Sequence, residues 1–258
     1  MNYRLCRTTY HRFWYRLQPG KQNRIIMKSL VKKLALCAVL GATMGANAVT
    51  FTLDPAASWL GYMNVFNLPA AGGGFQFGSG WGTADLCAKF TGTTLTLSPN
   101  TIGDPNSYWY TPGGGPGSKG AKIMDASMYI QLADGSYTGQ TLSFTGNVLA
   151  NTLFGKVDGN GLSWTATAFI KDFAPDYSSF NQSTASLVNG VFSIDLATIN
   201  DPARHVQYGF EVVGPDVWVT DVAQYGQIDI APALIPEPGI LALAGLGAAI
   251  WAVRRRQS

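Results

Sequence analysis

The chain has 258 residues, with 18 basic and 15 acidic side chains, 30 glycines and a formal net charge of +3. Nine basic residues lie in residues 1–33 and three in residues 254–256, so residues 49–235 keep six bases against 14 acids, a net charge of −8. Because nucleic-acid affinity comes mostly from basic contacts to phosphate, we do not expect this acidic part to bind nucleic acid. Its length is enough to bury a core without disulfide bonds.

Residues 1–26 do not have the layout of a targeting signal. Arginine, tyrosine, tryptophan and histidine are scattered through them without an apolar segment. The simplest interpretation is that translation begins at Met27. The alternative is an extended positive region in front of a signal peptide.

Residues 27–48 have the pattern of a secretory signal peptide. Lys28 and two further lysines form a positive region, residues 34–40 begin an apolar run, and Ala46-Asn47-Ala48 provides a small-x-small site. This order predicts a signal helix, export by the Sec machinery and cleavage directly after Ala48.

Residues 49–235 predict one all-β domain. Strand-length runs are separated by turns such as Asp134-Gly135 and Asn189-Gly190, which supply the positive φ angles of tight hairpins. About nine to eleven short strands without βαβ spacing predict an antiparallel β-sandwich of jelly-roll type. The expected strands are 83–90, 93–98, 123–132, 141–150, 162–173, 186–196, 205–213, 217–220 and 227–231.

The core is expected to come from apolar residues that alternate along these strands. In residues 164–171, Trp164 and Ala168 point one way, while Phe169 and Lys171 point the other. The expected core residues are Leu86, Phe90, Leu95, Leu97, Ile130, Leu142, Phe144, Val148, Trp164, Phe169, Ile170, Phe192, Ile194, Phe210 and Trp218.

Two glycine-rich stretches carry aromatic residues. Residues 103–120 hold Tyr108, Trp109 and Tyr110 at their centre, and residues 72–82 include Trp81. Exposed aromatic planes can pack against the C–H faces of sugar rings, so these four residues are the predicted glycan contacts. The alternative is that they fill the core, as Trp and Tyr do in many β-sandwiches.

Residue types that carry catalysis are scarce in residues 49–235. They contain one histidine, His205, and one glutamate, Glu211, and no Gly-x-Ser-x-Gly motif accompanies the histidine. His205 lies in a strand-like run, so we expect a packed or hydrogen-bonded strand residue. Two aspartates could still form a glycosidase pair, but the sequence marks no particular pair. No catalytic residue is therefore predicted.

Metal ligands and cysteines are equally sparse. Asp216 and Asp221 flank Trp218, and oxygen-rich turns of this kind can hold calcium, which needs six to eight oxygen ligands. Two carboxylates are too few to predict such a site, so no cofactor or metal is expected and calcium stays an alternative. Cys87 is the one cysteine after residue 48, and its apolar neighbours favour burial.

The end of the chain has three parts in a fixed order. Pro236-Glu237-Pro238 is followed by the uncharged residues 239–253 and then by Arg254-Arg255-Arg256. Fifteen apolar residues fall short of the roughly 20 that a helix needs to span a bilayer. The arginines would stay on the cytoplasmic side by the positive-inside tendency.

These three parts resemble the PEP-CTERM sorting signal. The resemblance implies that an exosortase, a membrane-embedded cysteine protease, cuts near Pro236-Glu237-Pro238 after residues 239–253 have held the chain at the membrane as an apolar helix. It also implies a Gram-negative bacterium that makes exopolysaccharide. The alternative is an ordinary tail anchor.

Three function classes follow from the sequence. The first is a non-catalytic surface or extracellular-matrix protein that is sorted through its tail and associated with exopolysaccharide. The second is a carbohydrate-binding module that uses the aromatic loops, and the third is a hydrolase. A sandwich fold supports all three, so it does not decide between them.

Overall fold

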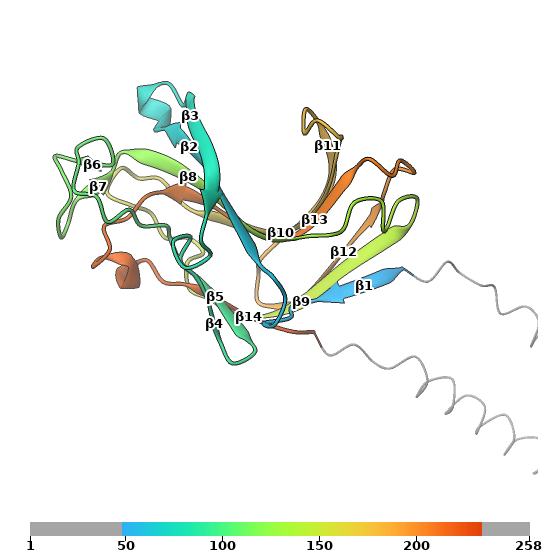
Figure 1. Cartoon of the computed structure of the whole chain (residues 1–258). Coiled ribbons are helices and arrows are strands. Elements are labelled where there is room, and N and C mark those ends of the chain that lie inside the picture. Colours follow the sequence, from blue (N-terminus) through green and yellow to red (C-terminus); the bar gives the residue numbers. More distant parts are fainter. Residues whose placement is uncertain (1–47, 234–258) are drawn as a thin grey trace, which may run out of the picture. The chain divides into compact units, whose positions relative to one another are not determined.

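The computed structural model describes residues 48–233, which form an all-β domain (Figure 1). The signal-peptide and tail helices expected on either side lie outside the described residues. In chain order the strands are β1 (Val49–Thr52), β2 (Leu60–Asn67), β3 (Phe75–Trp81), β4 (Ala88–Thr91), β5 (Thr94–Leu97), β6 (Tyr110–Thr111), β7 (Lys119–Gly120), β8 (Lys122–Gln131), β9 (Thr141–Asn151), β10 (Thr165–Phe173), β11 (Phe180–Ser186), β12 (Gly190–Ala197), β13 (His205–Pro215) and β14 (Ile228–Ala231).

The strands form two six-stranded sheets and one small hairpin. Sheet 1 has the order β11-β10-β13-β8-β2-β3, and all its neighbouring strands are antiparallel. Sheet 2 runs β4-β5-β14-β9, with β12 and β1 also paired to β9, and β6 pairs only with β7. From β8 onward almost every connection crosses from one sheet to the other (Figure 1). The predicted all-β sandwich is confirmed.

Helical structure in residues 48–233 is limited to two short 3-10 turns, η1 (Pro69–Ala71) and η2 (Val222–Gln224). Neither turn, nor any other part of that range, has the length and hydropathy of a membrane-crossing helix.

The main core lies between the sheets, where aromatic rings from both of them meet. Phe144 of β9 packs at 5.3 Å from Phe210 of β13 and at 5.0 Å from Tyr208, centroid to centroid. Twelve of the 15 expected core residues are buried, whereas Phe90, Ile130 and Trp218 are only partly buried. The alternating pattern of the strands was therefore a sound guide to the core.

Phe169 is buried but does not belong to the main core. Ala168 and Ile170 point into that core, so the alternation of β10 places Phe169 on the opposite face, where the Lys171 ammonium lies 4.3 Å from its ring centroid. The sequence correctly predicted that Phe169 and Ile170 point in opposite directions, and only the assignment of both to one core was wrong.

Several predicted strand limits differ from the structure. Residues 217–220 form a turn before η2, and the strand expected from residue 83 begins only at Ala88, after Cys87 adopts a φ of 56°. The glycine-rich residues 72–82, expected as a loop, contain the edge strand β3, and the strands β1, β2, β6, β7 and β11 were not anticipated. The left-handed backbone at Cys87 interrupts the regular hydrogen bonding of a strand, so β4 starts after it. Glycine is tolerated in β3 because an edge strand pairs with a neighbouring strand on one side only.

Candidate functional site

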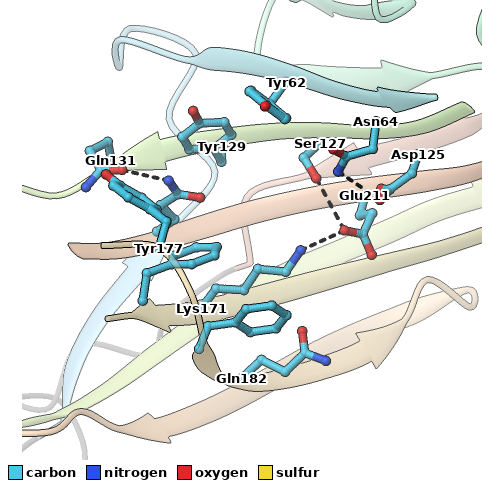
Figure 2. Close-up of a pocket in the computed structure, with 13 residues that line it drawn as sticks. Tyr62, Asn64, Asp125, Ser127, Tyr129, Gln131, Lys171, Tyr177, Gln182 and Glu211 are labelled. Carbon is cyan, nitrogen blue, oxygen red and sulfur yellow. Dashed lines mark hydrogen bonds and ion pairs between the residues drawn. The ribbon is translucent and has the colours of Figure 1, made fainter. Parts of the chain in front are cut away.

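The outer face of sheet 1 holds a cavity of about 760 Å³ (Figure 2). Its lining combines the aromatic rings of tyrosine and phenylalanine with amide and charged side chains. The lining residues are Tyr62 and Asn64 from β2, Asp125, Ser127, Tyr129 and Gln131 from β8, Gln207 and Glu211 from β13, Lys171 and Phe173 from β10, Phe180 and Gln182 from β11, and Tyr177 from the loop between β10 and β11.

Strand registry brings these residues together from distant parts of the chain. Side chains two apart on one strand share a face, and directly paired residues on neighbouring strands lie side by side. One row across the sheet joins Glu211, Ser127 and Tyr62, and a second joins Asp125 to Asn64. The pocket face is therefore the polar half of strands whose other half forms the core.

Gly209 lies on β13 between two lining residues of that strand, Gln207 and Glu211. It pairs with Phe169 on one side and with Tyr129 on the other. A Cβ built on Gly209 would lie 2.1 Å from the carbonyl oxygen of Met128, a distance that no side chain tolerates. The close approach of β8 thus requires glycine at this position.

Glu211 and Lys171 form an ion pair on the pocket floor. The Lys171 Nζ lies 2.7 Å from Glu211 Oε1, and the Ser127 hydroxyl donates to the same oxygen at 3.3 Å. The side chains of both charged residues are mostly buried, at 13% and 22% exposed. Each therefore depends on the other for compensation of its charge.

Asp125 is less well compensated. Asn64 donates to its Oδ2 at 3.2 Å, but its Oδ1 is buried and has no hydrogen-bond partner. Burial raises the pKa of Asp125 to about 6, and the negative charge of Glu211 adds to the effect. The site therefore contains a carboxylate whose negative charge is poorly compensated.

Tyr177 forms one wall of the pocket from a left-handed backbone conformation, with φ at 57°. Its ring stacks on His205, with centroids 4.5 Å apart and planes 4° apart. His205 Nδ1 lies 2.7 Å from Asp134 Oδ1, and its Nε2 lies 3.2 Å from the Pro175 carbonyl oxygen. Both partners are acceptors, so the doubly protonated imidazolium satisfies both contacts, and the bond to Asp134 raises the pKa of His205.

The four predicted glycan contacts do not line this pocket. Trp81, Trp109 and Tyr110 instead come together in a second hydrophobic cluster, in which Tyr110 is fully buried and the two tryptophans are half-buried. The Tyr110 hydroxyl donates to the Ile102 carbonyl at 2.7 Å and accepts from the Ile102 amide at 2.9 Å. Its ring is therefore not available to a ligand.

Tyr108 alone of the four is clearly exposed, at 39%. Its ring lies edge-on to Trp109, with centroids 4.7 Å apart, and the Lys122 ammonium sits 4.0 Å from the Tyr108 centroid. The loop thus offers one accessible aromatic plane on one side of the domain and does not form a platform.

The two aspartates weighed as an alternative calcium site, Asp216 and Asp221, lie in different surroundings. Asp216 is buried and its Oδ1 accepts from the Lys122 amide at 3.0 Å, whereas Asp221 accepts from the Gly117 amide at 2.6 Å. Burial raises the pKa of Asp216 to about 7. In residues 48–233 no three His, Cys, Asp or Glu side chains are grouped so that they could hold a metal ion. Cys87 is half-buried, with its Sγ 3.6 Å from Thr101 Oγ1.

The pocket residues of β8 follow a pattern that is visible in the sequence but does not depend on glycine-rich aromatic stretches. Residues 125, 127, 129 and 131 are Asp, Ser, Tyr and Gln, and they alternate with the apolar residues of the same strand. Alternate polar positions next to a core face are ordinary for a solvated sheet. Only the registry of five strands shows that these residues enclose a cavity.

Fold and pocket together define a β-sandwich, antiparallel except for the parallel pair of β1 and β9, with a polar and aromatic cavity on the outer face of one sheet. Residues 234–256, beyond the described part, match the family model of the PEP-CTERM protein-sorting motif. The match spans Pro236-Glu237-Pro238 and Arg254-Arg255-Arg256, so the resemblance of the tail to that sorting signal is confirmed. No curated protein and no solved structure matches the chain. The motif marks an extracellular protein that an exosortase sorts through its C-terminal tail.

Proposed function

We propose that this chain is a non-catalytic protein of the cell surface or extracellular matrix that binds exopolysaccharide in the pocket of sheet 1. The observation that carries the proposal is the lining of that pocket, in which accessible aromatic rings alternate with amide and carboxylate groups. The sorting motif supports it, because a protein released outside the cell meets polysaccharide there.

The aromatic rings of the pocket are accessible enough to stack on a ligand. Tyr62 is 39% exposed, Tyr177 is 52% exposed and Phe180 is 46% exposed. Ligand sites combine such apolar surfaces with a few polar groups that fix orientation, and their volumes are typically about 300–1,000 Å³. The cavity of about 760 Å³ lies within that range and suits a short stretch of a glycan chain.

Amide side chains supply the polar part of this recognition. Gln182, Gln207 and Gln131 follow one row across the sheet, and the Gln207 amide donates to Gln131 Oε1 at 2.7 Å. An amide both donates and accepts, which matches the dual character of sugar hydroxyl groups. This row and the aromatic wall together would hold a sugar ring by its faces and its edge.

A hydrolase is the second candidate, because the pocket contains two carboxyl groups with different surroundings. Asp125 has a pKa raised to about 6, and such a group can act as a general acid. However, Glu211 is bonded through one oxygen to both Lys171 and Ser127, which weakens it as a nucleophile or base. Binding without turnover is therefore the function that the geometry favours.

The binding test compares two tyrosines of equal exposure. Tyr62 in the pocket and Tyr108 in the glycine-rich loop are each 39% exposed. In affinity electrophoresis against exopolysaccharide from the producing cells, Tyr62→Ala should lower affinity at least ~10-fold, since aromatic contacts dominate such sites. Tyr108→Ala should change affinity less than ~2-fold, by the same reasoning. The reverse pattern would favour the loop, and release of reducing ends that Glu211→Gln abolishes would favour the hydrolase.

Export completes the proposal. Sec-dependent translocation across the inner membrane of a Gram-negative bacterium would use residues 27–48, with cleavage between Ala48 and Val49 directly before β1. The tail would hold the chain at the membrane until an exosortase acts. Intact-mass analysis of surface material should show a form that starts at Val49 and lacks most of residues 239–258. A mature form that retains Arg254-Arg255-Arg256 would leave the tail-anchor interpretation.

A further inference from the structure

The charges of the pocket on sheet 1 leave a net negative site. Asp125, Glu211 and Lys171 are its only ionisable residues of the Asp, Glu, Lys and Arg types, and Lys171 is already committed to Glu211 at 2.7 Å. The one arginine in residues 48–233, Arg204, is not among the lining residues and is bonded to Asp172 at 2.8 Å. An anionic group entering the pocket would find no free cation.

Asp125 adds a second, independent observation. Figure 2 shows Asp125 and Glu211 next to each other on neighbouring strands, with Asn64 beside Asp125. The Oδ1 of Asp125 is buried without any hydrogen-bond partner, although Oδ2 accepts from Asn64 at 3.2 Å. A carboxylate with a single hydrogen bond is stabilised by a ligand that brings another donor to it, and bonds to an ionised acceptor are stronger than neutral ones.

We infer that the pocket selects glycans that carry free hydroxyl groups but no acidic groups, and that Asp125 is the residue that determines this specificity. The inference rests on the proposed glycan-binding function and adds the class of ligand. A ring hydroxyl would donate to the Asp125 carboxylate from the pocket side while the ring face packs on the aromatic wall. A uronate, sulfate or phosphate group would bring a like charge next to two carboxylates, which opposes binding.

The experiment must separate a local effect from the repulsion of the whole acidic domain. Residues 49–235 have a net charge of −8, which alone disfavours acidic polymers. Asp229 lies on β14 in sheet 2, where its Oδ1 accepts from the Thr96 hydroxyl at 2.7 Å. Asp125→Asn and Asp229→Asn each remove one negative charge from the domain, but only the first changes the pocket. The second variant is therefore a matched control.

The secreted protein and both variants would be measured by affinity electrophoresis at pH 7.5 and moderate salt. The probes are neutral polysaccharides (β-glucan, xylan and galactomannan) and polyuronates (alginate and polygalacturonate). We expect the unmodified protein to be retarded by at least one neutral polymer and by neither polyuronate. In Asp125→Asn the ratio of neutral to acidic affinity should fall at least ~10-fold, because a charge-assisted bond is lost and a like charge is removed. In Asp229→Asn the ratio should stay within ~2-fold of the unmodified value.

Each alternative outcome contradicts a different statement. If the unmodified protein binds polyuronates as well as neutral polymers and Tyr62→Ala abolishes both, the glycan site stands and the inferred ligand class is wrong. If the two aspartate variants shift the ratio equally, the repulsion is global and Asp125 has no special role. If no polymer is retained although circular dichroism shows folded protein, the proposed function itself is wrong.

Discussion

Two aromatic-rich regions of this domain, the glycine-rich loop of residues 103–120 and the outer face of sheet 1, use similar residues for opposite purposes. In the loop, Tyr110 is completely buried, and its hydroxyl contacts three backbone groups of Ile102 and Val217. On the sheet, Tyr62 and Tyr177 keep their rings accessible beside amides and carboxylates. The loop serves as a satellite core, whereas the regular sheet presents the ligand surface.

The glycines show why the loop packs as it does. A Cβ on Gly114 would lie 2.3 Å from the Trp218 ring, so the absence of a side chain lets the loop backbone lie against that tryptophan. A composition that suggests an exposed loop can therefore also reflect close packing. The difference between the two regions lies in what surrounds each aromatic ring, and composition alone does not give that information.

The strongest test of this comparison is to truncate the tyrosine that the loop buries. Tyr110→Ala should lower the free energy of unfolding by about 3–5 kcal/mol, because it removes a fully buried ring and leaves backbone groups without their partner. Tyr108→Ala, in the same loop, should cost less than ~1 kcal/mol since its ring is 39% exposed. Urea unfolding followed by fluorescence measures both, and equal losses would show that the loop is not a core element.

A second test adds a methyl group at Gly209, where β13 lies close to β8. Gly209→Ala should lower the free energy of unfolding by roughly 1–3 kcal/mol, because the new methyl group would overlap the Met128 carbonyl and force the strands apart. Glycan affinity should fall as well. Gly80→Ala, in β3 of the same sheet, is the control, since its added Cβ would have its nearest neighbour 3.9 Å away. An unchanged Gly209→Ala protein would contradict the described floor.

Asp125 allows a test of whether the binding face is built at the expense of stability. Its folded-state pKa of about 6 is above the ordinary value, so its stabilising contribution is complete below about pH 4 and is lost as pH rises through 6. Asp125→Asn should therefore raise the free energy of unfolding by about 1–2 kcal/mol at pH 7.5 and by much less at pH 4. Asp229→Asn should show no such gain. Thermal unfolding at both pH values decides this, and a variant less stable at pH 7.5 would count against the buried, poorly compensated carboxylate.

The smallest expected effect concerns His205, which supports the Tyr177 wall. Its bond to Asp134 raises its folded-state pKa above the ordinary value of about 6.5. The contribution of this contact is therefore complete below about pH 6.5 and is lost as pH rises through the folded-state pKa. Asp134→Asn should lower Tm more at pH 5.5 than at pH 8.5. Asp201→Asn, which alters only a carboxylate bonded to the Ala203 amide, should show no such pH dependence.

The sequence predicted the sheet more successfully than the site. Alternation along β10 reflects a local rule, so the sandwich and most of its core could be anticipated. The turns at Asp134-Gly135 and Asn189-Gly190 were wrongly expected to close hairpins, because each connects a strand of sheet 1 to a strand of sheet 2. The pocket depends on pairing between strands far apart in the chain, such as Asp125 with Asn64, and on the left-handed Tyr177. No local pattern specifies these features. The aromatic residues of the glycine-rich stretches therefore suggested Trp109 and Tyr110 as ligand contacts in place of Tyr62 and Tyr177.

The first and last strands of the domain share one strand as their partner. β12 runs along one edge of β9 through residues 141–148, while β1 pairs with residues 142–145 and β14 with residues 147–151. The remaining edge of β9 is thus divided between the two ends of the domain. Sheet 2 cannot be completed until residue 231 has been made and delivered to the same compartment as residue 49. Since β14 ends at Ala231 and the sorting motif starts at residue 234, the strand that completes the sheet and the segment that carries the sorting signal are almost contiguous in the chain.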